Sequence, residues 1–305
     1  MQAFVKQSSA PNDVAIRHMP TPSVGERELL VRVQAIGVGI HDGYFHPPIG
    51  ESPYVIGIEA AGVVTEVGSE VANYDVGERI AFVSAMQPKG GTWAEYAVVA
   101  DEAPIVRLPE GMPFTQAAAV PVAGSTILRA LHALDLQPDE SVFIAGASGA
   151  IGTLAIQLAD ARGCHVVASA SKKNHDYMIG LGARKTVDYH DSDWPEHVRQ
   201  WFPTGVDAAI AIQPGTGSSS MAVVRDGGRV VPISGDQFAT ERGIALRQLP
   251  FLLDVHTELV DLMNQIAAGG VRMTIENVYP FARGLEALQK ASARHARGKS
   301  VLVIP

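Results

Sequence analysis

The stretch that decides the fold is GASGAIG at residues 146–152. An apolar run of strand length, SVFIA at residues 141–145, precedes it, and an apolar run with helical spacing follows at residues 150–162. Glycines let the chain turn tightly and let an anion approach the backbone amides at the positive end of the helix. The spacing is G-x-x-G-x-x-G rather than the commoner G-x-G-x-x-G, so the inference depends on the strand, loop and helix context. In preference to a merely structural turn, we predict a dinucleotide-binding loop made of Gly146, Ala147, Ser148, Gly149, Ala150, Ile151 and Gly152.

The residues after the next strand indicate which dinucleotide this loop would bind. A site for NADH usually carries Asp or Glu about 20 residues after the glycines, where the acid bonds the ribose 2′-hydroxyl. Here the segment is ASASKK at residues 168–173, which has no acid and offers hydroxyls and two positive charges. Such a set favours the 2′-phosphate of NADPH, although two solvated lysines in an exposed turn are the alternative. We predict NADPH as the cofactor, with its 2′-phosphate held by Ser169, Ser171, Lys172 and Lys173.

From residue 141 onward, short apolar strands alternate with helices. The further strands are predicted at residues 165–170, 185–188, 208–212 and 229–233. This alternation is typical of a parallel sheet with helices on both faces. The first third differs, because residues 28–36 alternate apolar and polar and residues 58–83 are rich in Val and interrupted by Gly. We therefore expect an α/β chain with a β-rich domain and a doubly wound parallel-sheet domain.

Helical spacing also occurs outside this alternation. Residues 115–134 have it, but Pro121 and Gly124 interrupt the segment, which predicts either a kinked helix or two helices. Near the C-terminus we expect helices at residues 258–268 and 281–292 and a strand at residues 299–304.

Composition limits the classes of protein. The chain has 305 residues, of which 47% are hydrophobic, enough apolar material for two folded domains. The net charge of −8 argues against a broad basic face for nucleic acid or an anionic membrane. No continuous apolar run approaches the roughly 18–20 residues that span a bilayer, and no secretory signal is visible. The single cysteine, Cys164, excludes an intrachain disulfide. We expect a cytoplasmic protein without a nucleic-acid or membrane partner.

An ordered set of motifs resembles the zinc-independent quinone oxidoreductases of the medium-chain dehydrogenase/reductase superfamily. The motifs are GIEAAGVV at residues 57–64, VG at 67–68, GERI at 77–80, residues 91–96, residues 117–126, the glycine loop, GGRV at 227–230 and GKSVL at 298–302. The resemblance covers essentially the full length. It implies a GroES-like β-rich catalytic domain from residues 1–119 and 258–305, a Rossmann NADPH-binding domain from residues 120–257, and a homodimer. The FLLDV run at residues 251–255 would be a strand that pairs across the two-fold axis, or alternatively part of the core.

The chain departs from the family's zinc-dependent relatives at the metal ligands. Those relatives carry a Cys-His pair where this chain has Gly39 and Ile40, and a further His where it has Ile58. With one cysteine, the chain also lacks their four-cysteine lobe. We therefore predict no metal, because the zinc that stabilises an alkoxide would have no ligands. Gly39 also replaces an Asn that faces the substrate in many quinone reductases, so the substrate preference does not carry over.

The resemblance implies two candidate catalytic residues. Tyr44 matches a substrate-pocket tyrosine that would polarise a carbonyl, and the alternative is a tyrosine at the edge of the core. His41 would donate a proton near the nicotinamide, or would instead lie at a loop surface or cap a backbone carbonyl. For Asp42 we favour a turn or an interdomain contact over an acid, and for Glu59 a structural hydrogen bond.

The resemblance also adds candidate cofactor residues. Thr126 matches a threonine near the nicotinamide, and Tyr189 matches a tyrosine along the 2′-phosphate ribose rather than a merely exposed aromatic. Ser234 and Gly235 end a strand, where open α/β sheets bind ligands. Lys299 matches a lysine near the cofactor, and a solvated lysine is the alternative.

These residues predict a zinc-independent, NADPH-dependent oxidoreductase that transfers hydride to a quinone or an α,β-unsaturated carbonyl. The segment SKKNHDY at residues 171–177 also resembles stand-alone enoyl reductases of the superfamily. A first alternative is therefore an enoyl reductase dedicated to one biosynthetic pathway. A second is a non-catalytic NADPH-binding protein with a redox-sensing or structural role, because no proton donor is obvious.

Overall fold

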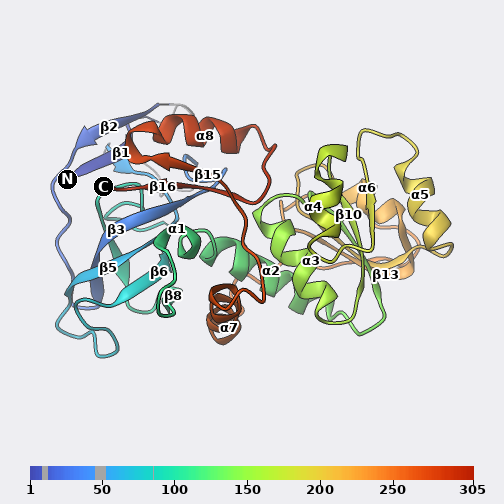
Figure 1. Ribbon diagram of the computed structural model, residues 1–305, viewed down its shortest axis with the longest axis horizontal. Coiled ribbons are helices and arrows are strands. Elements are labelled where there is room, and N and C mark those ends of the chain that lie inside the picture. The colour runs from blue at the N-terminus through green and yellow to red at the C-terminus, as the bar shows by residue number, and fades with distance from the viewer. Residues whose placement is uncertain (9–12, 45–52, 85) are drawn as a thin grey trace. The chain divides into compact units, whose positions relative to one another are not determined.

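The computed structural model describes residues 1–8, 13–44, 53–84 and 86–305. The chain forms two compact units. Unit 1 consists of Met1–Val122 with His256–Pro305, and unit 2 consists of Ala123–Val255. Unit 1 is β-rich, whereas unit 2 alternates strands and helices (Figure 1).

Within its described residues, unit 1 contains a seven-stranded sheet in the order β15-β16-β3-β5-β6-β8, with β7 paired to β3. The strands are β3 (Glu28–Val38), β5 (Glu59–Val67), β6 (Arg79–Val83), β7 (Tyr96–Ala100), β8 (Ile105–Arg107), β15 (Ile275–Pro280) and β16 (Lys299–Val303). β16 runs antiparallel to β3, with Ser300 opposite Val38. The C-terminal segment therefore completes a sheet that the N-terminal segment begins.

A smaller sheet and a few helices complete unit 1. The sheet has the order β2-β1-β4, with the bounds Val14–His18, Gln2–Lys6 and Tyr54–Val55. The helices are α1 (Phe114–Ala117), α7 (His256–Ala267), α8 (Gly284–Ser292) and the 3-10 turn η2 (Phe281–Arg283).

Alternating apolar residues explain how unit 1 forms its core. Along β3, Val31 and Val33 are buried while Arg32 between them is exposed. Phe4 of β1 packs edge-on against Trp93 and Phe281, with ring centroids 5.3 and 5.0 Å apart. Such aromatic pairs add about 0.5–1.5 kcal/mol each beyond their buried area.

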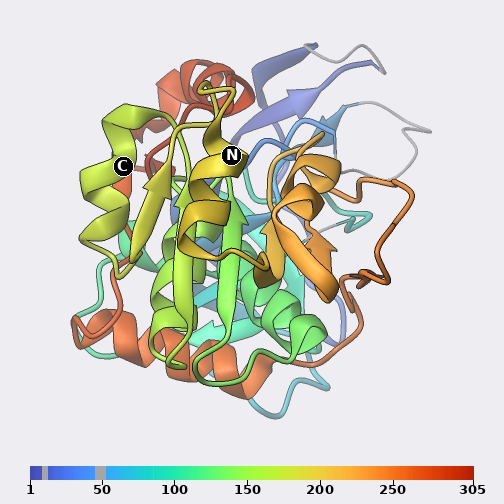
Figure 2. The same cartoon turned by 90° about the vertical axis from the view of Figure 1, so that its right-hand side faces the viewer.

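Unit 2 is built on a parallel sheet whose described strands have the order β11-β10-β9-β12-β13-β14 (Figure 2). The strands are β9 (Ser141–Ala145), β10 (His165–Ser169), β11 (Lys185–Val187), β12 (Val206–Ala211), β13 (Val224–Pro232) and β14 (Ala245–Leu246). All these pairings are parallel. The order corresponds to 3-2-1-4-5-6 within the unit, which is that of a Rossmann fold.

Helices connect the strands of unit 2. They are α2 (Pro121–Leu134), whose first two residues belong to unit 1, then α3 (Ala150–Asp160), η1 (Lys172–Asn174), α4 (His175–Ile179), α5 (Trp194–Trp201) and α6 (Gly217–Ala222). Every residue of β9 is buried, as expected for a central strand with helices on both faces.

The predicted fold class is confirmed, with a GroES-like β-rich part and a parallel-sheet Rossmann part. Of the two interpretations of residues 115–134, two helices is correct, because α1 ends at Ala117 and α2 begins at Pro121. The sequence analysis missed α5 and α6. The prediction of a strand at residues 251–255 was wrong, because none of them is in a described strand and the turn at Phe251 and Leu252 leaves these side chains 70% and 100% exposed. Only Val255, at 3% exposed, is buried, so most of this apolar run lies outside both the described strands and the core.

In the part of the chain that the structure describes, one helical stretch meets the length and composition of a membrane span. It is Phe114–Leu134, which α1 and α2 share, and 72% of its most apolar window is buried in the protein. The sequence analysis considered only continuous apolar runs and did not single it out. Buried core helices of soluble proteins meet the same test, so the stretch is weak support for a membrane span.

Candidate functional site

Backbone hydrogen bonds hold the glycine loop of unit 2 against the end of the neighbouring strand β10. Gly146, with a φ of +81°, follows β9, and the amides of Gly146 and Ala147 donate to the carbonyl oxygen of Ser169 at 3.1 and 3.0 Å. A Cβ at Gly152 would lie 2.5 Å from backbone atoms of Ala147, so only glycine fits there. No side chain of the described residues caps the start of α3, whose N-cap is Gly149. The loop therefore presents a helix N-terminus to an anion.

The seven predicted loop residues divide into two groups by this geometry. Gly146, Ala147 and Gly152 shape the loop, because the first two amides are bonded to Ser169 and the third position packs closely. The residues in between are Ser148, Gly149, Ala150 and Ile151, and all four are half-buried, as Gly146 is.

The predicted 2′-phosphate residues lie on adjacent parts of unit 2. Ser169 ends β10 and is buried, Ser171 is half-buried, and Lys172 and Lys173 are exposed on η1. Tyr189 follows β11, the neighbour of β10, and is 46% exposed. The structure thus brings these five residues to the carboxyl ends of two paired strands.

An acidic residue that the sequence analysis overlooked also lies there. Asp188 follows β11, and its Oδ2 accepts the Lys172 amide at 3.1 Å, while Oδ1 accepts the His190 amide at 3.0 Å. The His190 ring contributes a further contact, with Nδ1 2.8 Å from Oδ1. The hydrogen bond from the His190 amide, above all, holds the pKa of Asp188 below its usual range. Residues 168–173 contain no acid, but Asp188 from the end of the neighbouring strand places a carboxylate beside them.

Ser234 and Gly235 follow β13 at the same carboxyl edge of the sheet, and both are exposed. Gly235 has a φ of +76°, which a side chain would strain. Thr126 is half-buried on α2. Apart from Thr126, the predicted cofactor residues of unit 2 therefore lie where parallel strands end, the usual ligand-binding edge of an open α/β sheet.

The two candidate catalytic residues belong to a turn in unit 1, at residues 39–44, directly after β3. His41 and Tyr44 are exposed, and the Tyr44 amide donates to the His41 carbonyl at 2.9 Å. Asp42 between them is buried, and its Oδ2 accepts the Gly39 amide at 2.7 Å and the Trp93 indole N–H at 3.1 Å. Asp42 is therefore a turn residue, as the sequence analysis favoured.

Besides Asp42, the side chain of Lys6 also stabilises this turn, and it was not among the residues predicted from the sequence. Its ammonium group is buried, donates to the Gly43 carbonyl at 3.1 Å and lies 5.9 Å from the centre of the Tyr44 ring. A lysine within the apolar segment AFVK of β1 was the available sequence signal. The turn thus depends on residues far from it in the sequence.

Burial controls the charge of this turn. It raises the pKa of Asp42 to about 7, against the lowering effect of the Gly39 hydrogen bond and of Lys299. The pKa of His41 is lowered, first by partial burial of the ring and then by the positive charges of Arg294 and Lys299. His41 is therefore mainly neutral at pH 7, which weakens its predicted role as a proton donor.

Unit 1 contains a buried ion pair between the first residues of two strands of its large sheet. Lys299 at the start of β16 pairs with Glu59 at the start of β5, and both side chains are buried. Glu59 also accepts the Val122 amide at 2.8 Å. The structural hydrogen bond expected for Glu59 is present, and the alternative of a solvated Lys299 is wrong, because its ammonium group is enclosed with the carboxylate.

The positions of the relatives' zinc ligands hold no metal-binding side chains, since they are Gly39, Ile40 and Ile58. Among the residues that the structure describes, no group of three His, Cys, Asp or Glu side chains is arranged to hold a metal ion.

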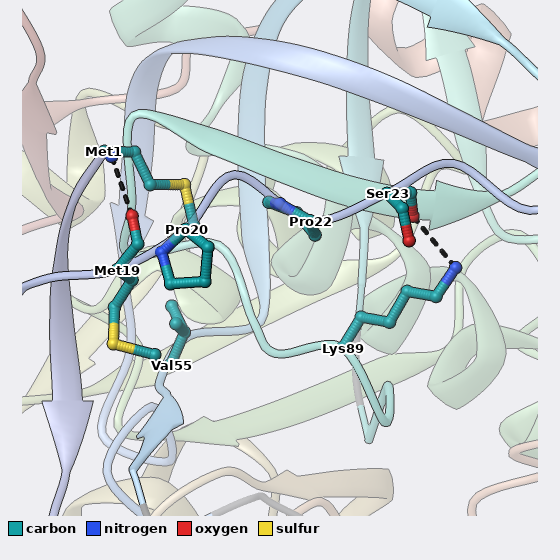
Figure 3. A pocket seen from close by; sticks show the side chains of 7 residues that line it. All are labelled: Met1, Met19, Pro20, Pro22, Ser23, Val55 and Lys89. Carbon is teal, nitrogen blue, oxygen red and sulfur yellow. Dashed lines mark hydrogen bonds between the residues drawn. The ribbon is translucent and has the colours of Figure 1, made fainter.

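Unit 1 also has a small pocket of about 240 Å³ (Figure 3). It is lined by Met1, Met19, Pro20, Pro22, Ser23, Val55 and Lys89. The Lys89 ammonium group donates to the Ser23 carbonyl at 3.0 Å. None of the predicted site residues lines this pocket, and its wall is mainly apolar, so the pocket is separate from the predicted site.

Comparisons with known proteins identify the family. Residues 25–110 match the alcohol dehydrogenase GroES-like domain, and residues 181–302 match the zinc-binding dehydrogenase domain. A quinone oxidoreductase of Sus scrofa is 28% identical over 96% of this chain and 92% of its own length. The trans-enoyl reductase RAP2 of Pyricularia oryzae is 30% identical over 74% of this chain and 69% of its own length. The chain belongs to the quinone oxidoreductase family of the medium-chain dehydrogenase/reductase superfamily. The family resemblance inferred from the motifs is thereby confirmed, and the chain is an oxidoreductase.

A solved structure of the same family supports this assignment. The quinone oxidoreductase of Coxiella burnetii is 25% identical and superposes with a TM-score of 0.89, covering 100% of this chain and 99% of its own.

Proposed function

We propose that the protein is a zinc-independent oxidoreductase that transfers hydride from NADPH to a quinone or an α,β-unsaturated carbonyl. The observation that carries the proposal is the glycine loop between β9 and α3, with Lys172 and Lys173 beyond the end of the next strand. Family membership supports a nicotinamide cofactor, and the two lysines favour NADPH over NADH.

The residues of unit 2 fit such a cofactor. The close packing at Gly152 leaves room for backbone but not for a side chain, as a pyrophosphate cradle requires. The amides of Ser148, Ala150 and Ile151 would bind the pyrophosphate, whereas the Gly149 amide already donates to the Gly146 carbonyl at 3.4 Å. Lys172, Lys173 and Tyr189 would hold the 2′-phosphate ribose. When bound, the cofactor supplies the hydride, while the protein binds and orients.

In unit 1, the turn at residues 39–44 would act on the acceptor. The Tyr44 hydroxyl would donate a hydrogen bond to the oxygen on which negative charge develops. A neutral His41 keeps one ring N–H for orienting the acceptor. Gly39, Ile40 and Ile58 replace the zinc ligands, so this hydrogen bond would take over the polarising role that zinc has in the relatives.

The test is a spectrophotometric screen of NADPH oxidation with benzoquinone, phenanthrenequinone, an enal, a cyclic enone and an enoyl thioester. We expect turnover with quinone or enone, slower turnover with NADH, and no effect of a chelator. Loss of activity with a chelator, restored by zinc, would contradict the zinc-independent proposal. NADH preferred over NADPH would contradict the cofactor proposal.

Two alternatives differ in the same screen. The identity to the trans-enoyl reductase RAP2 favours a dedicated enoyl reductase, which would turn over the enoyl thioester and leave the quinones unreduced. The lowered pKa of His41 leaves no evident proton donor in the described turn, which favours a non-catalytic NADPH binder. Tight NADPH binding without turnover of any acceptor would support that second alternative.

The proposal includes a homodimer in the cytoplasm. Phe251 and Leu252 are exposed on the turn that follows the edge strand β14, where a second copy would cover them. Light scattering coupled to gel filtration should give twice the chain mass, and a Phe251→Ser/Leu252→Ser variant should shift it toward the monomer. A wild-type monomer would contradict the dimer. Fluorescence microscopy of a tagged chain in its own cells tests the location.

A further inference from the structure

The carboxylate of Asp188 joins the two loops that form the ribose end of the proposed cofactor site. One oxygen accepts the Lys172 amide from η1, and the other accepts the amide and contacts the ring of His190. Asp191 reinforces the turn, because its amide donates to the Asp188 carbonyl at 3.0 Å. The backbone of Lys172 and the residue His190 are thus joined by one side chain.

This arrangement fixes which nitrogen of His190 faces outward. A carboxylate accepts hydrogen bonds only, so Nδ1, 2.8 Å away, is the nitrogen that carries the proton. The Tyr189 ring packs on the imidazole, with centroids 4.0 Å apart, and limits its rotation. Nε2 is therefore the nitrogen available to a ligand. In the neutral ring it accepts a hydrogen bond, and in the protonated ring it donates one.

The two ligand groups at this position need opposite partners. A ribose 2′-phosphate only accepts and is negatively charged, whereas a 2′-hydroxyl also donates. We propose that Asp188 and His190 form a specificity-determining pair that favours the 2′-phosphate when His190 is protonated and disfavours it when His190 is neutral. This inference rests on the proposed use of a nicotinamide dinucleotide.

The sign follows from the charges. Asp188 stays ionised at neutral pH, because hydrogen bonds lower its pKa. With a protonated His190 the pair carries no net charge, and with a neutral His190 it carries one negative charge beside the phosphate. The charge of the pair therefore depends on whether the imidazole carries its second proton. Asp188 and Tyr189 contact His190 directly. The other charged and titratable groups on the segments that meet there, namely η1, the loop after β11 and α5, are Lys172, Lys173, Asp191, Asp193 and His197.

The experiment measures nucleotide binding rather than activity. Adenosine 2′,5′-bisphosphate and adenosine 5′-monophosphate are titrated calorimetrically into the full chain at about pH 6 and about pH 8.5, and the ratio of their affinities is followed. Between the lower and the higher pH, we expect the affinity ratio to fall about five- to tenfold more in wild type than in His190→Gln. The variant serves as the reference because its ratio still changes with the ionisation of the phosphate itself. Asp188→Asn should raise the ratio at the higher pH by about the same factor.

A matched control is available in the same unit. His197 also pairs with an aspartate, since its Nδ1 lies 3.6 Å from Asp191 Oδ2, and His197→Gln should leave the pH dependence of the ratio as in wild type. The proposal would be overturned if His190→Gln bound both nucleotides equally more weakly, or if the pH dependence of the affinity ratio were unchanged. Asp188 and His190 would then have a structural role only. Binding of neither nucleotide to wild type would overturn the proposed cofactor use itself, and the pair with it.

Discussion

The glycine loop of unit 2 and the turn at residues 39–44 of unit 1 both follow the end of a strand, but different interactions hold them. The loop is fixed by backbone hydrogen bonds from Gly146 and Ala147 to Ser169 and by close packing at Gly152. The turn is fixed by the buried side chains of Asp42 and Lys6 and by an indole from Trp93. A site built from backbone tolerates many side chains but few changes at glycine. A site built from buried charges depends on each partner and on pH.

The largest expected effect concerns the ion pair in unit 1. Lys299→Met leaves the carboxylate of Glu59 buried without its cation, which should lower the free energy of unfolding by about 3–5 kcal/mol. Urea unfolding followed by tryptophan fluorescence measures it. The double variant Glu59→Gln/Lys299→Met should recover more than half of the loss.

A surface pair serves as the control for that prediction. Lys290 lies 3.5 Å from Glu276 with about a third of its side chain exposed, so Lys290→Met should cost less than about 1 kcal/mol. Equal losses in Lys299→Met and Lys290→Met would show that the buried pair contributes no more than a surface one.

The second prediction is a pH dependence caused by Asp42. Burial raises its pKa from 3.8 to about 7, so below pH 7 the folded protein holds a proton that the unfolded chain releases above about pH 4. The stability from this group is therefore greatest near pH 4 and falls by roughly 4 kcal/mol as the pH rises to 7. Asp42→Asn keeps an oxygen acceptor for Gly39 and Trp93 without the charge, and it should remove this slope.

The measurement is the free energy of unfolding of wild type and Asp42→Asn at several values between about pH 4 and 8. The difference between the two curves isolates Asp42 from the other titrating groups. Parallel curves would mean that folding does not raise the pKa of Asp42.

The third prediction concerns the backbone-built loop. The Cβ of Gly152→Ala would meet the Ala147 backbone at 2.5 Å, so the loop must shift, at a cost of about 2–3 kcal/mol in stability and a clear loss of NADPH affinity. At Gly149 the nearest atom to an added Cβ is 3.8 Å away, and Gly149→Ala should cost at most about 1 kcal/mol. Thermal unfolding and NADPH fluorescence titration test both. Similar destabilisation of the two variants would mean that packing does not select glycine here.

The smallest expected effect tests the acceptor side. Tyr44→Phe removes the hydroxyl proposed to polarise a carbonyl, and it should lower kcat about tenfold with KM for NADPH unchanged. Tyr74→Phe, in the same unit and against Arg107, is the control and should keep the wild-type kcat. An unchanged kcat in Tyr44→Phe would remove the tyrosine from the proposed mechanism, and the turn would then be a structural element only.

The parts of the fold that the sequence analysis found are those with a local pattern. The alternation in β3, the buried run of β9 and the break at Pro121 each reflect a constraint on neighbouring residues. The short helices α5 and α6 were missed because six to eight residues are too few for a clear apolar period. Residues 251–255 were predicted to form a strand or part of the core, since sequence alone does not show that most of an apolar run stays exposed.

The candidate site divides in the same way. The sequence by itself determined the glycine loop, the basic residues after β10 and the replacement of the zinc ligands, because each depends on which residue stands at one position. Only the tertiary structure decided that Asp188 meets Lys172, that Trp93 meets Asp42 and that Glu59 meets Lys299 across 240 residues of chain. These contacts join segments that are distant in sequence, and they set the burial on which the charge of a carboxylate or a histidine depends.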